Sequence, residues 1–335
     1  RGAHVLLVSC FLLLGLLSKE TGALFLVAVF LFTLLFIKNT IGKQILTIAI
    51  SLSGYLLLRL HVASVPFQAV DYLPIATASL FERISSIPKM ASYYIQSFFF
   101  PKNLAISQHW VVREMTFSDF FFPLLIVLIF LVAISILGVW VWRTNHTQRP
   151  IFLFFSLWFL LGMLFHLQIF PLSMTVADRW FYFPIVGLLG IIGSTAQSIY
   201  GYVRSESSRG KEALPQFPMV GLLGIIGIIV QSLFGKTQTR ILAISVILLV
   251  IGVLSARTVW RSLDWRDGFT LYSHDIAISK NSYDLENALG VELFKIKRYD
   301  EAKAHFGRSV ELLALPINLT NMGIYYQRMG DAKKA

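Results

Sequence analysis

Residues 120–142 read FFFPLLIVLIFLVAISILGVWVW, an apolar run without a charged side chain. A helix needs roughly 20 mostly apolar residues to cross about 30 Å of hydrocarbon, and this run is long enough. Runs of the same kind lie at residues 21–37, 44–60, 151–170, 183–200 and 241–256, and residues 4–17 look like part of another. The sequence therefore predicts an all-α, polytopic bundle of membrane helices and a multi-pass integral membrane protein.

The composition separates this membrane part from a more polar part. Hydrophobic residues make up 56% of the 335 residues and charged residues only 14%, whereas a soluble domain carries about 25% charged residues. Residues 1–256 hold 17 basic and 8 acidic side chains, and the much shorter stretch 257–335 holds 12 and 10. The basic excess of the first part lies between apolar runs, which favours membrane lipids as partners and speaks against nucleic acid. A single cysteine, Cys10, cannot form an internal disulfide.

Two weaker segments leave the topology open. Residues 218–234 are apolar but short, and residues 84–100 carry Lys89 and two tyrosines, so we expect about seven to nine membrane segments within residues 1–256. Basic clusters at residues 38–43, 143–149 and 204–211 indicate the cytoplasmic side, which places residues 168–182 outside. Residues 61–83 and 102–119 are both outside if residues 84–100 dip into the membrane and return, or lie along its surface.

A duplicated segment bears on the same question. Residues 183–201 and 217–235 align without gaps, and 13 of 19 positions are identical. Each added crossing reverses the side of everything that follows. We expect the second copy to span the membrane as a closely packed, glycine-rich helix, which leaves open the side that carries the C-terminal part.

The C-terminal part has the pattern of a helical repeat. Residues 257–282 read as a linker, and from residue 283 the spacing of small and large apolar residues is that of a tetratricopeptide repeat: Leu289, Gly290, Leu293, Tyr299, Ala302 and Phe306. Gly323 follows Gly290 by 33 residues, and a period near 34 is typical of this solenoid. Residues 283–335 therefore predict one complete and one truncated repeat, with more expected after Ala335. Such repeats bind a protein or peptide partner.

Three polar motifs lie between the apolar runs. Lys19 and Glu20 belong to a solvated hairpin loop or to the rim of a membrane cavity. Asp178 and Arg179 precede a run of aromatics, where the arginine could hold a phosphate or the loop could anchor at the interface. His109 could position a substrate or be a buried structural residue.

Several kinds of site are not expected from the sequence. The histidines are far apart and no paired Cys/His spacing occurs, so no metal site is predicted. The chain also lacks a P-loop, a dinucleotide-binding glycine motif and a nucleophile elbow. We therefore expect no bound cofactor.

Taken in order, four motifs resemble one family. They are residues 18–22 (SKETG), residues 101–110 (PKNLAISQHW), residues 176–184 (VADRWFYFP) and residues 257–267 (RTVWRSLDWRD), and the repeats follow them. Together they are similar to the transmembrane and tetratricopeptide repeat-containing O-mannosyltransferases and their prokaryotic relatives. The resemblance implies the C-type glycosyltransferase fold, with membrane helices around an outward-facing cavity.

The resemblance also implies an activity. The family uses a sugar linked to polyprenyl or dolichyl phosphate and transfers it, as mannose, to a hydroxyl group such as that of a protein serine or threonine. Its catalytic acidic residue lies in the first outward loop, which is expected before Arg1. The departing phosphate needs cations, so Arg179 and Lys19 are expected to contact it, Asp178 to orient Arg179, and Glu20 to pair with Lys19.

Two functions follow from these observations. The first is a membrane glycosyltransferase, in the plasma membrane if the source is prokaryotic. The alternative is a non-catalytic membrane scaffold that recruits partners through its repeats. An acidic residue in the first outward loop would favour the enzyme.

Overall fold

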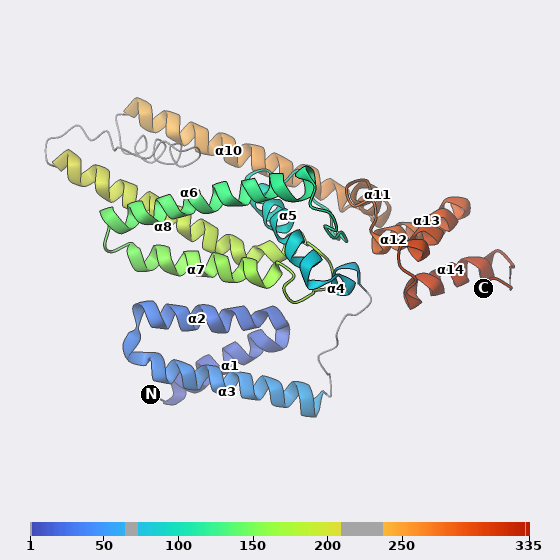
Figure 1. Ribbon diagram of the computed structural model, residues 1–335, viewed down its shortest axis with the longest axis horizontal. Coiled ribbons are helices and arrows are strands. Elements are labelled where there is room, and N and C mark those ends of the chain that lie inside the picture. The colour runs from blue at the N-terminus through green and yellow to red at the C-terminus, as the bar shows by residue number, and fades with distance from the viewer. Residues whose placement is uncertain (1, 64–72, 209–236, 332) are drawn as a thin grey trace. The chain divides into compact units, whose positions relative to one another are not determined.

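The computed structural model describes residues 2–63, 73–208, 237–331 and 333–335 (Figure 1). Its regular elements in these ranges are helices, with one isolated bridge between Gln108 and Val176. The chain forms two compact units, which are described separately: unit 1 comprises residues 1–69, 132–164 and 183–231, and unit 2 comprises residues 70–131, 165–182 and 232–335. The second copy of the duplicated segment, residues 217–235, lies outside the described residues.

Among the described residues, five helical segments are long and apolar enough to cross a membrane. They are Lys38–Val62, Phe117–Thr144, Arg149–His166, Asp178–Tyr202 and Ile244–Asp264, and two shorter apolar helices cover Val5–Ser18 and Ala23–Phe36. Each long apolar run of the sequence thus forms a helix, as predicted. The reason is that a helix satisfies its own backbone hydrogen bonds, which hydrocarbon cannot do.

Unit 1 is built from apolar helices. They are α1 (Gly2–Ser18), α2 (Ala23–Phe36), α3 (Ile41–Leu57), the later part of α6 (Phe122–Thr144), α7 (Arg149–His166) and α8 (Tyr182–Ser208). A hydrogen bond from Ser51 Oγ to the carbonyl oxygen of Ser9 (3.0 Å) joins α3 to α1. On α8, a Cβ at Gly187 would lie 2.5 Å from the backbone nitrogen of Phe159, so only glycine permits this approach to α7. Gly187 and Gly190 of the first copy of the duplication therefore serve helix packing.

Unit 2 holds the remaining helices. They are α4 (Pro74–Thr77), α5 (Leu80–Phe99), the short π-helical turn η4 (Phe117–Phe121) that leads into α6, the 3₁₀ turn η5 (Asp178–Phe181), α10 (Thr237–Asp264), α11 (Gly268–Ile278), α12 (Tyr283–Lys295), α13 (Tyr299–Leu312) and α14 (Pro316–Arg328). Residues 257–282, predicted as a linker, are mostly helical, because α10 continues to Asp264 and α11 fills most of the rest. Asp267 caps α11 by accepting the Thr270 N–H at 2.7 Å, and Phe269, Tyr272 and Ile276 bury the helix against the core of α12–α14.

The helices α12, α13 and α14 share one apolar core. Its buried members are Leu289, Leu293, Ala302, Phe306 and Tyr325. A Cβ at Gly290 would lie 2.7 Å from the Phe306 ring, so the small residue lets α12 and α13 touch. The burial expected for Leu289, Leu293, Ala302 and Phe306 is confirmed.

Candidate functional site

The segment of residues 100–116, between α5 and η4, is where distant parts of unit 2 meet. Gln108 forms the bridge with Val176, and the Thr175 N–H donates to the Gln108 carbonyl at 3.0 Å. The Thr175 hydroxyl accepts from the Trp110 N–H at 3.1 Å and donates to the Trp110 carbonyl at 2.6 Å. The motif at residues 101–110 therefore lies directly beside the motif at residues 176–184.

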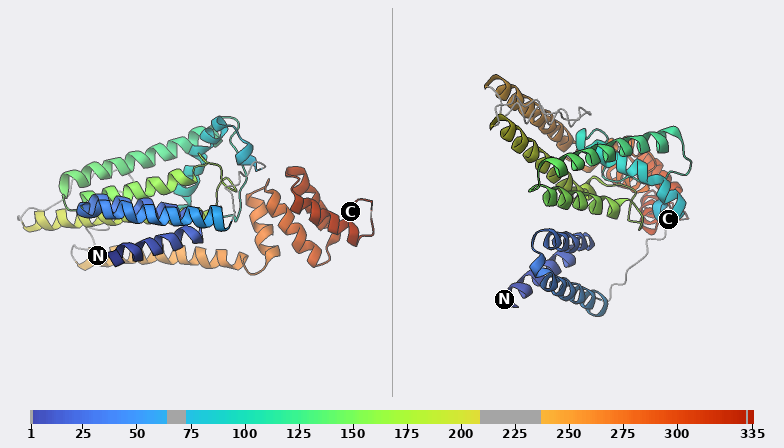
Figure 2. Two further views of the ribbon diagram at one scale, coloured as in Figure 1. Left: turned by 90° about the horizontal axis from the view of Figure 1, so that it is seen from below. Right: turned by 60° about the vertical axis from the view of Figure 1, so that its left-hand side comes forward.

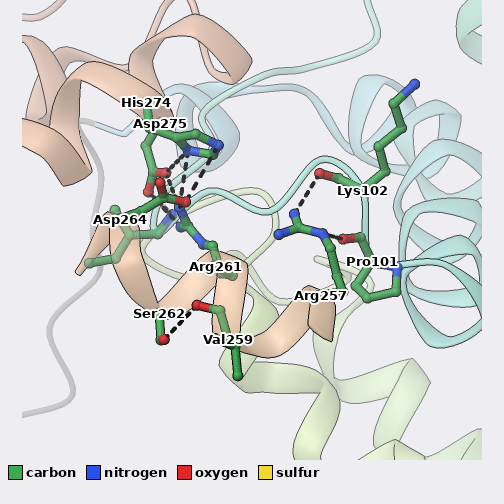
Figure 3. Close-up of polar contacts among 10 residues, drawn as sticks. Pro101, Lys102, Arg257, Val259, Arg261, Ser262, Asp264, His274 and Asp275 are labelled. Atoms are coloured by element: carbon green, nitrogen blue, oxygen red, sulfur yellow. Dashed lines mark hydrogen bonds and ion pairs between the residues drawn. The ribbon is translucent and has the colours of Figure 1, made fainter. Parts of the chain in front are cut away.

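The C-terminal end of α10 holds the start of the same segment (Figure 3). The Arg257 guanidinium donates to the carbonyl oxygens of Pro101 (2.9 Å) and Lys102 (3.1 Å). These carbonyls follow the end of α5, so no backbone N–H of that helix donates a hydrogen bond to them. The motif at residues 257–267 thus contacts the motif at residues 101–110.

A buried ionic cluster lies one helical turn further along α10. Asp275 of α11 is fully buried and lies 2.8 Å and 3.1 Å from the two terminal nitrogens of Arg261, which also contacts Asp264 at 3.0 Å. His274 Nδ1 is 2.7 Å from the Asp275 carboxylate (Figure 3). The Ile106 N–H donates to the same carboxylate at 2.8 Å. One aspartate therefore ties α10, α11 and the 100–116 segment together.

The side chain of His109 is buried and belongs to a second group of polar contacts, a tether between the 100–116 segment and the start of α12. Its Nε2 atom lies 2.9 Å from Ser107 Oγ and 3.3 Å from the Asp284 carboxylate, and its ring packs on Tyr283 at 4.7 Å between centroids. In a catalytic Ser-His-Asp triad the serine and the aspartate contact different ring nitrogens, whereas here both contact Nε2. These contacts bury His109 in a link between the 100–116 segment and the start of α12.

Asp284 anchors this tether. Burial disfavours its charge, but the hydrogen bond and charge of His109 and the hydroxyls of Ser107 and Ser282 outweigh burial and lower the pKa of Asp284 to about 2. The Ser107 hydroxyl donates to the carboxylate at 2.5 Å. The carboxylate is therefore ionised at neutral pH and joins the start of α12 to the 100–116 segment.

Asp178 and Arg179 point to different surroundings. Asp178 accepts a hydrogen bond from the Tyr93 hydroxyl of α5, and the charges of Arg261, Asp275 and Arg179 act on its carboxylate. Burial, together with the charge of Asp178, raises the pKa of the Tyr93 hydroxyl, so the tyrosine remains the donor. The contact described for the exposed Arg179 guanidinium is with the Met174 sulfur at 3.8 Å. Asp178 thus accepts a hydrogen bond from Tyr93, and the expectation that it orients Arg179 stays a prediction.

Lys19 and Glu20 belong to unit 1. Lys19 is exposed between α1 and α2, and Glu20 opens a short 3₁₀ turn at Glu20–Gly22. The side chain of Glu20, and with it the expected Lys19–Glu20 pair, lies outside the described part of the structure.

Sequence reasoning did not single out Tyr93, Asp275 or Asp284 as site residues. Each contacts a residue at least 85 positions away, as in the Tyr93–Asp178 pair, so no local spacing marks it. The available signal was weak: a charged or phenolic side chain inside an otherwise apolar helical pattern. Over the described ranges, no group of three or more His, Cys, Asp or Glu residues is placed to hold a metal ion.

The chain matches no protein-family model, no curated protein and no solved structure in the comparisons.

Proposed function

We propose that the chain is a membrane glycosyltransferase that moves a sugar from a polyprenyl-phosphate carrier to a hydroxyl group. One observation supports this above all others. Three of the four motifs that carry the family resemblance meet in unit 2. The motif at residues 101–110 contacts the motif at residues 176–184 through the Gln108–Val176 bridge and the motif at residues 257–267 through Arg257, which is 156 residues from Pro101 in the sequence. Motifs that matched the family by chance would have no reason to meet at one place.

The chemistry of the cluster suits a lipid-linked donor. The exposed Arg179 lies at the beginning of the candidate membrane span Asp178–Tyr202, the level at which a lipid phosphate is found. A guanidinium binds a phosphate with two parallel hydrogen bonds. Arg179 is therefore our candidate for the phosphate contact, and Asp178, held by Tyr93, keeps the backbone of this turn in place.

The proposed reaction is an inverting transfer. The acceptor hydroxyl oxygen bonds to the anomeric carbon of the sugar, the bond from that carbon to the phosphate oxygen breaks, and polyprenyl phosphate leaves with the electron pair. A carboxylate takes the hydroxyl proton, which in the family that the chain resembles is an acidic residue of the first outward loop. Cations stabilise the charge that develops on the departing phosphate.

Substitution of Arg179 tests this function. Sugar transfer from labelled polyprenyl-phosphate mannose to a hydroxyl acceptor is measured in vesicles that contain the full protein. We expect Arg179→Ala to reduce the rate by about a hundredfold or more, as for the loss of other groups that stabilise transition-state charge. Arg113→Ala, which removes an exposed arginine of the 100–116 segment, is the matched control and should retain activity. Equal rates in the two variants would contradict the phosphate contact, and no transfer by the parent protein would favour the scaffold.

The helices α12–α14 support a second element of the proposal. The touching of α12 and α13 at Gly290 and Phe306 is the contact expected where two helices of a tetratricopeptide repeat meet. We therefore assign residues 283–335 to such repeats, which dock a protein or peptide partner. A scaffold without catalytic activity would use the same surface, so only the transfer assay separates the two functions.

A further inference from the structure

Helix α5 differs from every membrane-spanning candidate. It is a 20-residue helix, yet it is not apolar enough to count as a span, because it carries Glu82, Arg83 and Lys89. Its middle is buried, with Ser86, Met90 and Tyr94 almost fully covered. A helix with this pattern belongs neither to the interior of the bilayer nor entirely to water.

The first two turns of α5 expose large apolar side chains. Leu80, Phe81 and Ile84 are each more than half exposed, Phe81 at 64%. A capping box between Ser79 and Glu82 begins the helix here, so the exposed side chains sit on a well-formed turn. Exposed apolar side chains that cluster in this way mark a surface that contacts protein or membrane.

One ion pair fixes α5 beside the start of α6, and a longer one joins α5 to the 100–116 segment. Lys89 Nζ lies 2.7 Å from the Asp119 carboxylate, and Arg113 lies 3.9 Å from the Glu82 carboxylate. Asp119 belongs to η4, which opens the candidate span Phe117–Thr144, the most apolar of the five. In a membrane, the first residues of this candidate span would lie at the boundary between headgroups and hydrocarbon, and the Lys89–Asp119 pair would hold α5 at the same depth.

The direction of α5 agrees with this depth. Within unit 2, the helix runs crosswise to the first part of α6, residues 122–131, rather than alongside it (Figures 1 and 2). The neighbouring segment adds Met115 and Phe117, the latter 74% exposed, and the side chain of Arg113, 79% exposed, is the adjoining cation. Apolar side chains next to a cation are typical of helices that lie in the interfacial layer.

We propose that α5 lies in the plane of the membrane surface, with phospholipid as the partner of its exposed face. Leu80, Phe81, Ile84, Met115 and Phe117 contact the acyl chains of the leaflet that α6 enters, and Arg113 contacts anionic headgroups. This inference does not depend on the transferase function. It selects one of the topologies that the sequence left open, in which residues 61–83 and 102–119 lie on the same side of the membrane.

Quenching by labelled lipids tests this placement in the full protein. Cys10→Ser first removes the native thiol. Phe81→Cys and Phe117→Cys are then made singly and labelled with an environment-sensitive fluorophore, and the protein is reconstituted into vesicles of phosphatidylcholine and phosphatidylglycerol. The lipids carry a quencher either near the headgroup or near the end of the acyl chain. Two matched positions complete the set: Ile129→Cys in the middle of α6 and Lys303→Cys on the exposed face of α13.

The expected pattern is specific. At positions 81 and 117 the shallow quencher acts at least about twofold more strongly than the deep one, position 129 shows the reverse, and position 303 shows no quenching. Stronger quenching by the deep lipid at position 81 would mean that α5 crosses the membrane. If position 81 is not quenched, the exposed face of α5 contacts water, a second copy of the chain or another protein. Both this result and stronger quenching by the deep lipid would overturn the proposal. Equal gel-filtration elution of all variants in detergent confirms that each is folded, and the transfer assay is a separate measurement.

Discussion

Removing the carboxylate of Asp275 should detach the 100–116 segment from α10 and α11. This fully buried group accepts the Ile106 N–H at 2.8 Å and contacts both terminal nitrogens of Arg261. Breaking a buried ion pair by removing one partner costs about 3–5 kcal/mol. Arg261 keeps its contact with Asp264, so we expect the lower end of this range for Asp275→Ala, about 3 kcal/mol.

Hydrogen exchange, followed by mass spectrometry on the full protein in detergent, measures this cost where it arises. The Ile106 amide exchanges only when its hydrogen bond to Asp275 opens. A loss of about 3 kcal/mol corresponds to roughly hundredfold faster exchange, since about 1.4 kcal/mol is a factor of ten. Peptides that contain Ile106 should show this change, and peptides from α13 should not.

Two further variants should change the exchange rate of the Ile106 amide by smaller amounts or not at all. Asp275→Asn keeps an oxygen that can accept the Ile106 N–H but removes the charge that Arg261 needs, so we expect about tenfold faster exchange. Asp300→Asn alters an exposed acid on α13 and should leave the exchange of Ile106 unchanged. The reasoning is refuted if Ile106 exchanges at the parent rate in Asp275→Ala, or if only peptides far from the cluster lose protection.

Two other predictions concern the packing and the pH response of unit 2. Gly290→Ala should destabilise α12–α14 by about 1–3 kcal/mol in urea unfolding, because the new Cβ would lie 2.7 Å from the Phe306 ring. Gly307→Ala on the opposite helix meets nothing within 4 Å and should be neutral or stabilising, so equal losses in the two variants would contradict the packing. The lowered pKa of Asp284 stabilises the fold at pH values above its ordinary value of 3.8, and this stabilisation is lost as the pH falls from about 4 towards 2. Asp284→Asn should therefore flatten the pH dependence of unfolding in this window, and an unchanged profile would show that its tether to His109 contributes little.

The membrane helices and the core of α12–α14 could be predicted from the sequence because their causes are local. An apolar run such as residues 120–142 must become a helix in hydrocarbon, whatever else the chain does. In the same way, Leu289 and Phe306 are buried because small and large apolar residues recur at helical spacing within one short stretch. The motifs around Asp178 and Arg257 could be compared with a family from the sequence, since each is a contiguous string of residues.

Residues 257–282 show what local reasoning leaves out. They lie between the last apolar run and the first repeat, and the sequence predicts only a linker there. The tertiary structure instead extends α10 through Arg257 and Arg261 and satisfies these charges with carbonyls of Pro101 and Lys102 and with Asp275. Composition alone cannot show that a charged side chain has a buried partner.

The contacts within the candidate site were decided by tertiary structure alone. Ile106 and Asp275 are 169 residues apart, Ser107 and Asp284 are 177 apart, and Tyr93 and Asp178 are 85 apart. Such pairs leave no periodic trace in the sequence, because their geometry depends on which helices pack and on how deeply the polar groups are buried. Local periodicity therefore determined that these residues lie in or between helices, and only the folding of unit 2 determined which charges neutralise one another and that Arg179 remains exposed.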